Sequence, residues 1–298
     1  MLNKFALPCH PTGRVPLWLA GGLLVLLVAA APWPVYADGV TARAAMTDAR
    51  NPLMELSTSR GNLYIELFPE EAPNNVRHFM ALAAGEIAIL DPATNTEFRP
   101  RYYDGMRFHR VLPNFIIQAG SPVYHPLGAP DSPLADEINA DALGLNRIPV
   151  MNADGSFNSM LNITSKSDFD TQILKPLYAT MGITALGDLR SRQNEVLEAL
   201  QGMTVKTAYE NQGYRYQTRT PSHPVTRGVV ALANQGPDSN GAEFFISLSN
   251  ANWLSGRYTV IGQVIEGMEI ADAIGQVAID PSQFSRQSTV IYSINNLD

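Results

Sequence analysis

The chain has almost no cysteine: Cys9 is the only one among 298 residues. A single thiol cannot form an intramolecular disulfide. Cys9 also precedes the long apolar run near the N-terminus, whereas a lipid-modified cysteine would follow such a run, so a lipoprotein is not indicated. Stability therefore has to come from a hydrophobic core, and the 45% hydrophobic content is ordinary for a globular protein.

Positive charge is also scarce, with 21 basic against 28 acidic residues and a formal net charge of −7. We therefore expect no nucleic-acid partner. His78, His125 and His223 lack the spacing of metal ligands, and no cysteine could help them. No glycine-rich phosphate loop or nucleophile–base pair stands out either. The sequence thus predicts neither a metal site nor a cofactor.

One unbroken apolar run occurs, at residues 17–31, after two basic residues and before two prolines. The run is short for a membrane span, which needs ~20 residues, and Ala37 suits a signal-peptidase site. We predict a cleaved signal peptide at 1–37 and a flexible leader at 38–52. The mature protein would be periplasmic or secreted, with no stable membrane association. The alternative is an uncleaved signal that anchors the protein.

Short alternating segments separated by Gly, Pro and Asn turns are typical of β-structure. Strands are expected at 53–58, 63–68, 108–120 (two short strands), 229–232, 244–248, 259–265 and 289–294. Helical spacing predicts only two flanking helices, one ending near Gly85 and one at 267–274. This pattern favours a mostly-β fold, a closed antiparallel barrel capped by two helices.

Residues 140–222 do not fit a plain loop, because so long a connection is uncommon in a compact domain. Apolar residues between 186 and 200 follow helical spacing, with Thr184 as a cap and Gly202 as a stop. A shorter helical turn at 169–177 is disturbed by Pro176. We predict a helical subdomain inserted into a domain that spans 53–298. A partly disordered insertion is the alternative.

Two motifs carry the functional signal. Residues 108–118 read FHRVLPNFIIQ, and residues 233–246 read ANQGPDSNGAEFFI. Together they resemble the two halves of the active groove of a cyclophilin, a peptidyl-prolyl cis-trans isomerase. The resemblance covers residues 53 to about 136 and 226 to 294. It implies an eight-stranded cyclophilin-like barrel and proline-containing polypeptides as partners.

The implied catalytic residue is Arg110. Rotation about the bond before proline faces a barrier of ~18–20 kcal/mol, because amide resonance must be lost. In the twisted state the proline nitrogen regains a lone pair, so a fixed guanidinium beside it stabilises the transition state selectively. Phe115, Ile116, Phe245 and Leu254 would form the apolar pocket for the proline ring.

Further residues follow from the resemblance. Gln118 would bond Arg110 or the substrate backbone, and Ala233, Asn234 and Gln235 would pair with an extended peptide. Trp253 would lie at the groove edge, and in the family this tryptophan accompanies sensitivity to cyclosporin-type ligands.

Three positions depart from the common pattern of the family. Glu243 replaces a glutamine, Tyr258 replaces a histidine, and Gln235 replaces a small residue. All three are still expected to bind substrate, with an altered rate or side-chain preference. The predicted function is isomerisation of X-Pro bonds that assists the folding of exported proteins. The alternative is a non-catalytic peptide-binding chaperone or scaffold that uses the same groove.

Overall fold

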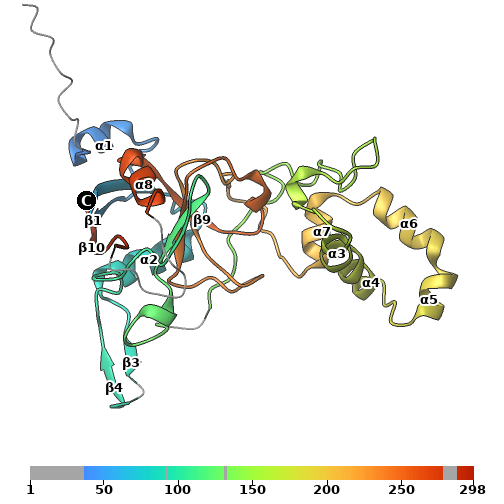
Figure 1. The fold of residues 1–298 in the computed structure, drawn as a ribbon, viewed down its shortest axis with the longest axis horizontal. Coiled ribbons are helices and arrows are strands. Elements are labelled where there is room, and N and C mark those ends of the chain that lie inside the picture. Colours follow the sequence, from blue (N-terminus) through green and yellow to red (C-terminus); the bar gives the residue numbers. More distant parts are fainter. Residues whose placement is uncertain (1–36, 92, 131–132, 278–286) are drawn as a thin grey trace, which may run out of the picture. The chain divides into compact units, whose positions relative to one another are not determined.

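The structure is a computed structural model that describes residues 37–91, 93–130, 133–277 and 287–298. The predicted signal peptide therefore lies outside the described residues, apart from Ala37. One eight-stranded antiparallel sheet dominates, in the order β10-β1-β2-β9-β7-β8-β6-β5. Figure 1 labels its strands β1, β9 and β10. Its strands are β1 (Leu53–Thr58), β2 (Gly61–Leu67), β5 (Arg110–Leu112), β6 (Ile116–Ala119), β7 (Val229–Leu232), β8 (Phe244–Ser247), β9 (Val260–Glu266) and β10 (Ile291–Asn296). The mostly-β, antiparallel prediction is confirmed.

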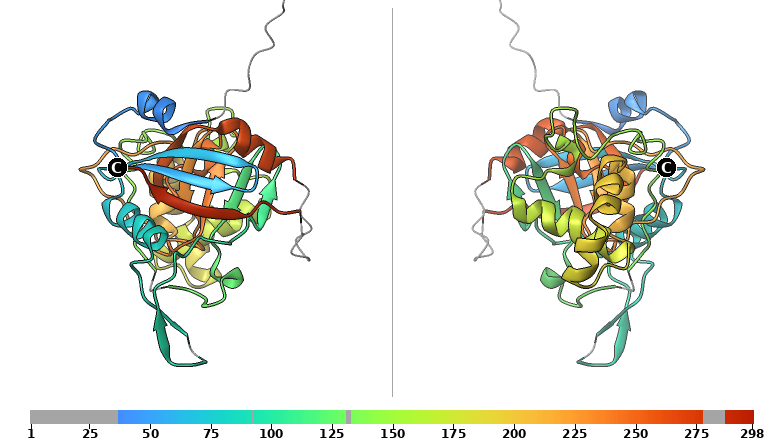
Figure 2. Two further views of the ribbon diagram at one scale, coloured as in Figure 1. Left: turned by 90° about the vertical axis from the view of Figure 1, so that its left-hand side faces the viewer. Right: turned by 90° about the vertical axis from the view of Figure 1, so that its right-hand side faces the viewer.

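The prediction of a closed barrel is wrong. Strands β10 and β5 are the two ends of the sheet and share no regular ladder. The segment before β5 meets the start of β10 through an isolated bridge between Arg107 and Val290 and through a backbone hydrogen bond from Ile291 to Met106, without a continuous ladder. The physical reason is the shortness of β5, whose three residues pair with β6 on one side and form no ladder on the other. Figure 2 shows the blue strands β1 and β2 beside the red β10 at the other end.

Two helices pack on this sheet, α2 (Pro73–Ala84) and α8 (Met268–Gly275). Helix α2 ends at Gly85, whose φ of 75° is the left-handed conformation that favours glycine. Its N-terminus has no side-chain cap of its own, and Glu137 instead accepts hydrogen bonds from the backbone N–H groups of Asn74 and Asn75. A carboxylate there complements the helix dipole. The barrel core lies between the sheet and these helices.

The aromatic centre of that core consists of Phe79, Tyr103 and Phe244. Phe244 meets both other rings edge-on, with centroids 5.6 and 5.5 Å apart. The phenol of Tyr103 is fully buried and donates to the carbonyl oxygen of Ala242 at 3.0 Å. This contact ties α2 and its following loop to the strand that carries the second motif.

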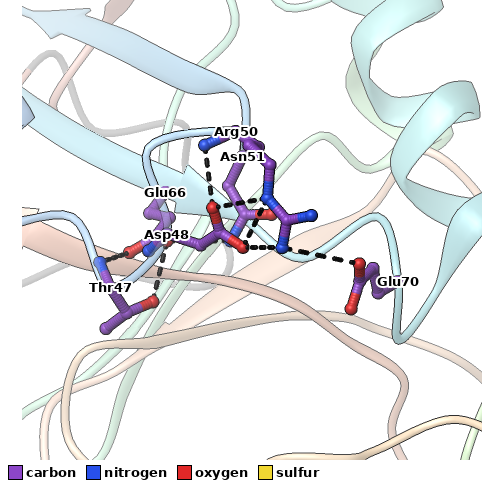
Figure 3. A network of polar contacts seen from close by, with 6 residues as sticks. All are labelled: Thr47, Asp48, Arg50, Asn51, Glu66 and Glu70. Carbon is purple, nitrogen blue, oxygen red and sulfur yellow. Dashed lines mark hydrogen bonds and ion pairs between the residues drawn. The ribbon is translucent and has the colours of Figure 1, made fainter.

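The segment predicted to be a flexible leader is structured instead. It contains α1 (Gly39–Ala45), capped by Asp38, with Ala42 fully buried. Buried Glu66 on β2 accepts hydrogen bonds from Thr47, Asp48 and Asn51, as Figure 3 shows for part of the network. The sequence pattern could not reveal this, because the carboxylate that organises the segment comes from a strand far along the chain.

The insertion is helical. Its elements are η2 (Ser159–Leu161), α3 (Lys166–Phe169), η3 (Asp170–Leu174), α4 (Lys175–Thr180), α5 (Leu186–Ser191), α6 (Gln193–Gln201) and α7 (Val205–Asn211). The helix predicted over 186–200 is broken at Arg192, and its N-cap is Ala185 rather than Thr184. Gly202 does end it. Its buried residues form a hydrophobic cluster separate from the barrel core, including Leu145, Ile173 and Tyr209.

Pro176 disturbs the helix in an identifiable way. Segment η3 is π-helical and leads into α4, where proline occupies the first turn. Proline has no N–H to bond the carbonyl four residues back, at Gln172. That carbonyl instead accepts a hydrogen bond from Nε2 of Gln212, on the residue that ends α7, at 2.9 Å. The lost helical bond is thus replaced by a tertiary one.

The remaining elements were not predicted. Strands β3 (Ile89–Asp91) and β4 (Thr96–Phe98) form a separate two-stranded sheet, and η1 (Pro122–Tyr124) and η4 (Asn252–Leu254) are short 3₁₀ turns. Within the described residues, no helix combines the length and apolar character needed to cross a bilayer.

Candidate functional site

Arg110 and Gln118 lie opposite each other on the β5–β6 hairpin. The guanidinium of Arg110 donates from Nη1 to Oε1 of Gln118 at 3.0 Å, as expected from the sequence. Arg110 itself is exposed, whereas Gln118 is buried. A buried partner on a paired strand holds the fork of an exposed cation in one direction.

The polar chain continues from Gln118 to Glu243 and His109. Gln118 donates from Nε2 to Oε1 of Glu243, and Nε2 of His109 lies 3.0 Å from the same oxygen. A carboxylate only accepts hydrogen bonds, so it fixes the amide of Gln118 with its nitrogen inward and its oxygen toward Arg110. The resemblance implies that Glu243 binds substrate. The structure places Glu243 two hydrogen bonds behind the arginine, with His109 beyond it.

Glu243 remains ionised over the ordinary pH range. Burial raises the pKa of Glu243, but hydrogen bonds from His109, Gln118 and Ser121 outweigh burial and hold the pKa below its usual value. The buried Nδ1 of His109 has no hydrogen-bond partner among the described residues, and the ring lies 5.1 Å from that of Tyr124. The negative charge behind Gln118 is therefore permanent in neutral solution.

The hairpin borders a cavity of about 350 Å³, called the slot below. Ten of the predicted site residues line it: Arg110, Phe115, Ile116, Gln118, Ala233, Asn234, Phe245, Trp253, Leu254 and Tyr258. Its apolar walls are organised by ring contacts, with Phe115 and Trp253 5.8 Å apart and Phe245 edge-on to Tyr258 at 5.4 Å. A fixed cation beside an apolar wall can donate a hydrogen bond to a polar atom of a ligand whose apolar ring fills the cavity. Such stabilisation is non-covalent and needs no nucleophile.

The two other predicted residues, Gln235 and Glu243, line an adjoining cavity of about 430 Å³. It shares Gln118, Ala233 and Asn234 with the first cavity. The Ala233–Gln235 segment thus forms a ridge between the two cavities. An extended peptide that occupied both cavities would cross this ridge. Gln235 lines only the adjoining cavity, although the resemblance implies that it pairs with the same extended peptide as Ala233 and Asn234.

Asn234 is used within the protein itself. Its Nδ2 donates to the carbonyl oxygen of Arg257 at 2.9 Å, and to Oδ1 of Asn240 at 3.3 Å. The side chain therefore joins the ridge to the loop that follows Trp253 and Leu254. Both of these bonds use Nδ2, so the expected contact with a substrate backbone would come from the side-chain oxygen or the main-chain groups.

Sequence reasoning missed two residues that line the first cavity, Asn162 and Arg257. Asn162 follows η2 in the insertion and has a left-handed φ of 49°. Arg257 lies between two predicted residues, Leu254 and Tyr258, and this position was the only available signal. Nothing in the sequence places Asn162 there, because the contact joins the insertion to the barrel.

A larger cavity, about 650 Å³, lies between α2 and the β1 and β10 strands. Its walls include Val76, Met80 and Ile294, and none of the predicted site residues. No group of three or more potential metal ligands occurs among the described residues. All of the predicted site residues line the two smaller cavities.

The chain is similar to a known family of proteins. A family described as cyclophilin type peptidyl-prolyl cis-trans isomerase matches residues 53–296. The chain is 26% identical over 228 residues to peptidyl-prolyl cis-trans isomerase B of Streptomyces anulatus, covering 76% of this chain and 85% of that protein. It is 25% identical over 241 residues to peptidyl-prolyl cis-trans isomerase A of Mycobacterium tuberculosis, covering 80% and 88%. A crystal structure of a cyclophilin type isomerase from Cryptosporidium parvum aligns with a TM-score of 0.46 and 18% identity, covering 83% and 98%.

Proposed function

The chain belongs to the cyclophilin-type peptidyl-prolyl cis-trans isomerase family, and we propose that it uses Arg110 to isomerise X-Pro bonds in exported proteins. Isomerase activity is the family's activity and that of its named relatives. The residue roles, the substrates and the location form the proposal.

In the proposed mechanism, the proline ring occupies the apolar slot between Phe115 and Phe245. Both planar isomers fit less well than the twisted amide, because only the twisted nitrogen has a lone pair that can accept from Arg110. The hydrogen bond to Gln118 keeps the guanidinium in place while the rest of the peptide rotates. No covalent intermediate and no proton transfer are needed.

One observation carries this proposal: Arg110 lines the same cavity as Phe115, Ile116 and Phe245. Arg110 is exposed, and apart from its bond to Gln118 its donors have no partner among the described residues, so they are available to a bound peptide. The negative charge of Glu243, two hydrogen bonds away, supports the orientation of the fork without neutralising it.

The test is the rate of cis/trans isomerisation of a short proline peptide. Arg110→Ala should lower kcat/KM by about 100-fold or more, the usual effect of removing a preorganised transition-state donor. Arg110→Lys should recover only part of the rate, because a point charge lacks the fork. An unchanged rate in Arg110→Ala would overturn the catalytic role of this residue. Arg190→Ala, in α5 of the insertion, serves as the control.

Export is proposed from the sequence of residues 1–37, which lie outside the described structure except for Ala37. The mature protein would act in the periplasm or outside the cell, on polypeptides that fold after translocation. N-terminal sequencing of the purified protein tests this, with Asp38 expected first. A retained N-terminus together with recovery in the membrane fraction would favour the anchored alternative.

Binding of cyclosporin-type ligands is proposed from Trp253, which is partly exposed at the rim of the slot and lies against Phe115. An indole there offers an N–H donor beside an apolar face. Inhibition of the isomerase by cyclosporin, weakened in Trp253→Ala, is the expected result. Equal inhibition of both proteins would remove Trp253 from this role.

A further inference from the structure

The cavity that holds Arg110 contains a second guanidinium, that of Arg257. No Asp or Glu is among the described residues that line it, although the chain as a whole has a net charge of −7. Neither arginine has a carboxylate within ion-pair distance in the described part of the chain. The cavity is therefore a positive hollow on an acidic protein.

The insertion fixes the position of Arg257. Its guanidinium carbon lies 5.4 Å from the ring centroid of Tyr209, over the ring face, in a cation–π contact. Tyr209 is fully buried in the insertion core and donates its hydroxyl to the carbonyl oxygen of Met160 at 2.9 Å. A rigid ring supported by such a bond restricts the long arginine side chain and lowers the entropy that binding would cost.

Neighbouring Gly256 strengthens the same junction. Its φ is 86°, and an added Cβ would collide with Leu145 of the insertion. Its carbonyl oxygen accepts a hydrogen bond from the hydroxyl of Tyr216 at 2.8 Å. The loop that carries Trp253, Leu254 and Tyr258 on the slot is thus packed from behind by the insertion.

Most donors of Arg257 are uncommitted. Only Nη2 makes a hydrogen bond, to the carbonyl oxygen of Trp253 at 2.9 Å, and the buried Nε has no partner among the described residues. Asn162 lines the same cavity, and its side-chain amide has no hydrogen bond to any described residue. A guanidinium and an amide together offer the donors that a carboxylate accepts best.

From these observations we propose that Arg257 and Asn162 form a subsite for an acidic side chain close to the isomerised proline. The inference rests on the proposed function and deepens it by naming a substrate class, namely proline segments that carry Asp or Glu beside the proline. Arg257 is then a specificity-determining residue, and the insertion is what holds it in place.

The experiment compares pairs of proline peptides that differ only by Glu or Gln, placed in turn at each of the two positions on either side of the proline. In the wild-type protein, kcat/KM for the Glu peptide should exceed that for the Gln peptide by about fivefold at the best position, the effect of one partly exposed ion pair. Raising the salt concentration should reduce this ratio.

In Arg257→Gln the ratio should fall to near one, and Arg257→Lys should retain part of it. Asn162→Ala should lower it by a smaller factor. The control is Arg147→Gln, which removes an exposed arginine of the insertion and should leave the ratio unchanged.

Two outcomes overturn the proposal. Equal rates for Glu and Gln peptides at every position in the wild type would show that no acidic subsite exists. A uniform loss for both peptides in Arg257→Gln, with an unchanged ratio, would show that Arg257 only supports the loop. Failure of the proposed isomerase function would give a different result from these two outcomes. In that case the protein would not raise the isomerisation rate of any peptide above the uncatalysed rate.

Discussion

The barrel and the insertion are built in different ways. The barrel core is held by strands paired across long stretches of sequence, and the second motif places Phe244 in that core and Phe245 on the face of the slot. The insertion has its own cluster of buried residues and meets the groove loop around Gly256 and Arg257. The barrel therefore supplies most of the residues that line the slot, and the insertion packs against one loop of the slot on the side away from the cavity.

The strongest test of this contrast is a cavity in the barrel core. Phe244→Ala removes a fully buried ring that meets Phe79 and Tyr103. We expect the free energy of unfolding to fall by about 3–5 kcal/mol. The isomerase activity should disappear at temperatures where the variant's barrel unfolds. Urea denaturation measures the loss. Tyr292→Ala, which truncates a 59% exposed side chain, should change stability little.

The matching test in the insertion is Ile173→Ala. Ile173 is 1% exposed in the separate insertion core, so its truncation should cost about 2–4 kcal/mol. Because the two cores are separate, kcat/KM for a peptide without acidic residues should change by less than about twofold below the transition. Thermal unfolding followed by circular dichroism, with Leu197→Ala as an exposed control, separates these effects. A parallel loss of activity would show that the two cores act as one.

Within the barrel, Glu243→Gln tests the chain behind Arg110. A glutamine can present either its oxygen or its nitrogen to Gln118, so the fixed direction of the Gln118 amide would be lost. We expect about a threefold lower kcat/KM, the scale of one hydrogen bond. Near neutral pH the wild-type rate should not vary through protonation of Glu243, because the lowered pKa keeps this carboxylate ionised. The rate should fall only in acid, as the pH drops through that pKa.

The smallest effect concerns the point where the chain returns from the insertion to the barrel. There Nδ1 of His223 contacts the buried carboxylate of Glu71, which also accepts from the His223 backbone at 2.9 Å. The hydrogen bond to Glu71 raises the pKa of His223 above its value in an unfolded chain, with burial opposing and Glu66 adding to it. The stabilisation is therefore complete below the unfolded pKa and is lost as the pH rises through the folded one.

His223 is half exposed, so solvent screening limits this stabilisation to under about 1 kcal/mol. Unfolding free energies of the wild type and His223→Gln should differ most in mildly acidic buffer and converge above neutral pH. A difference that grows with pH would contradict the assignment.

Much of the barrel could be predicted from the sequence. Strand β7 was predicted at its observed bounds, and α8 within one residue, because alternation and helical spacing are local patterns. Seven of the ten predicted slot residues lie in the two continuous motifs, and the other three, Trp253, Leu254 and Tyr258, follow shortly after the second. The leader was misjudged, since Glu66 on β2 holds it in place. Barrel closure was also misjudged, since it depends on whether the free edges of β5 and β10 pair with each other.

By itself, the sequence determined the family, the strands of the groove and the pairing of Arg110 with an apolar slot, because all of these are encoded in short runs of residues. Only the tertiary structure decided that His109 and Glu243 stand behind Gln118, that Asn162 from the insertion lines the groove, and that Tyr209 packs against Arg257. The physical reason is that hydrogen bonds and ring contacts between distant segments leave no periodicity in either segment. They arise only when the packing of both cores brings those segments together.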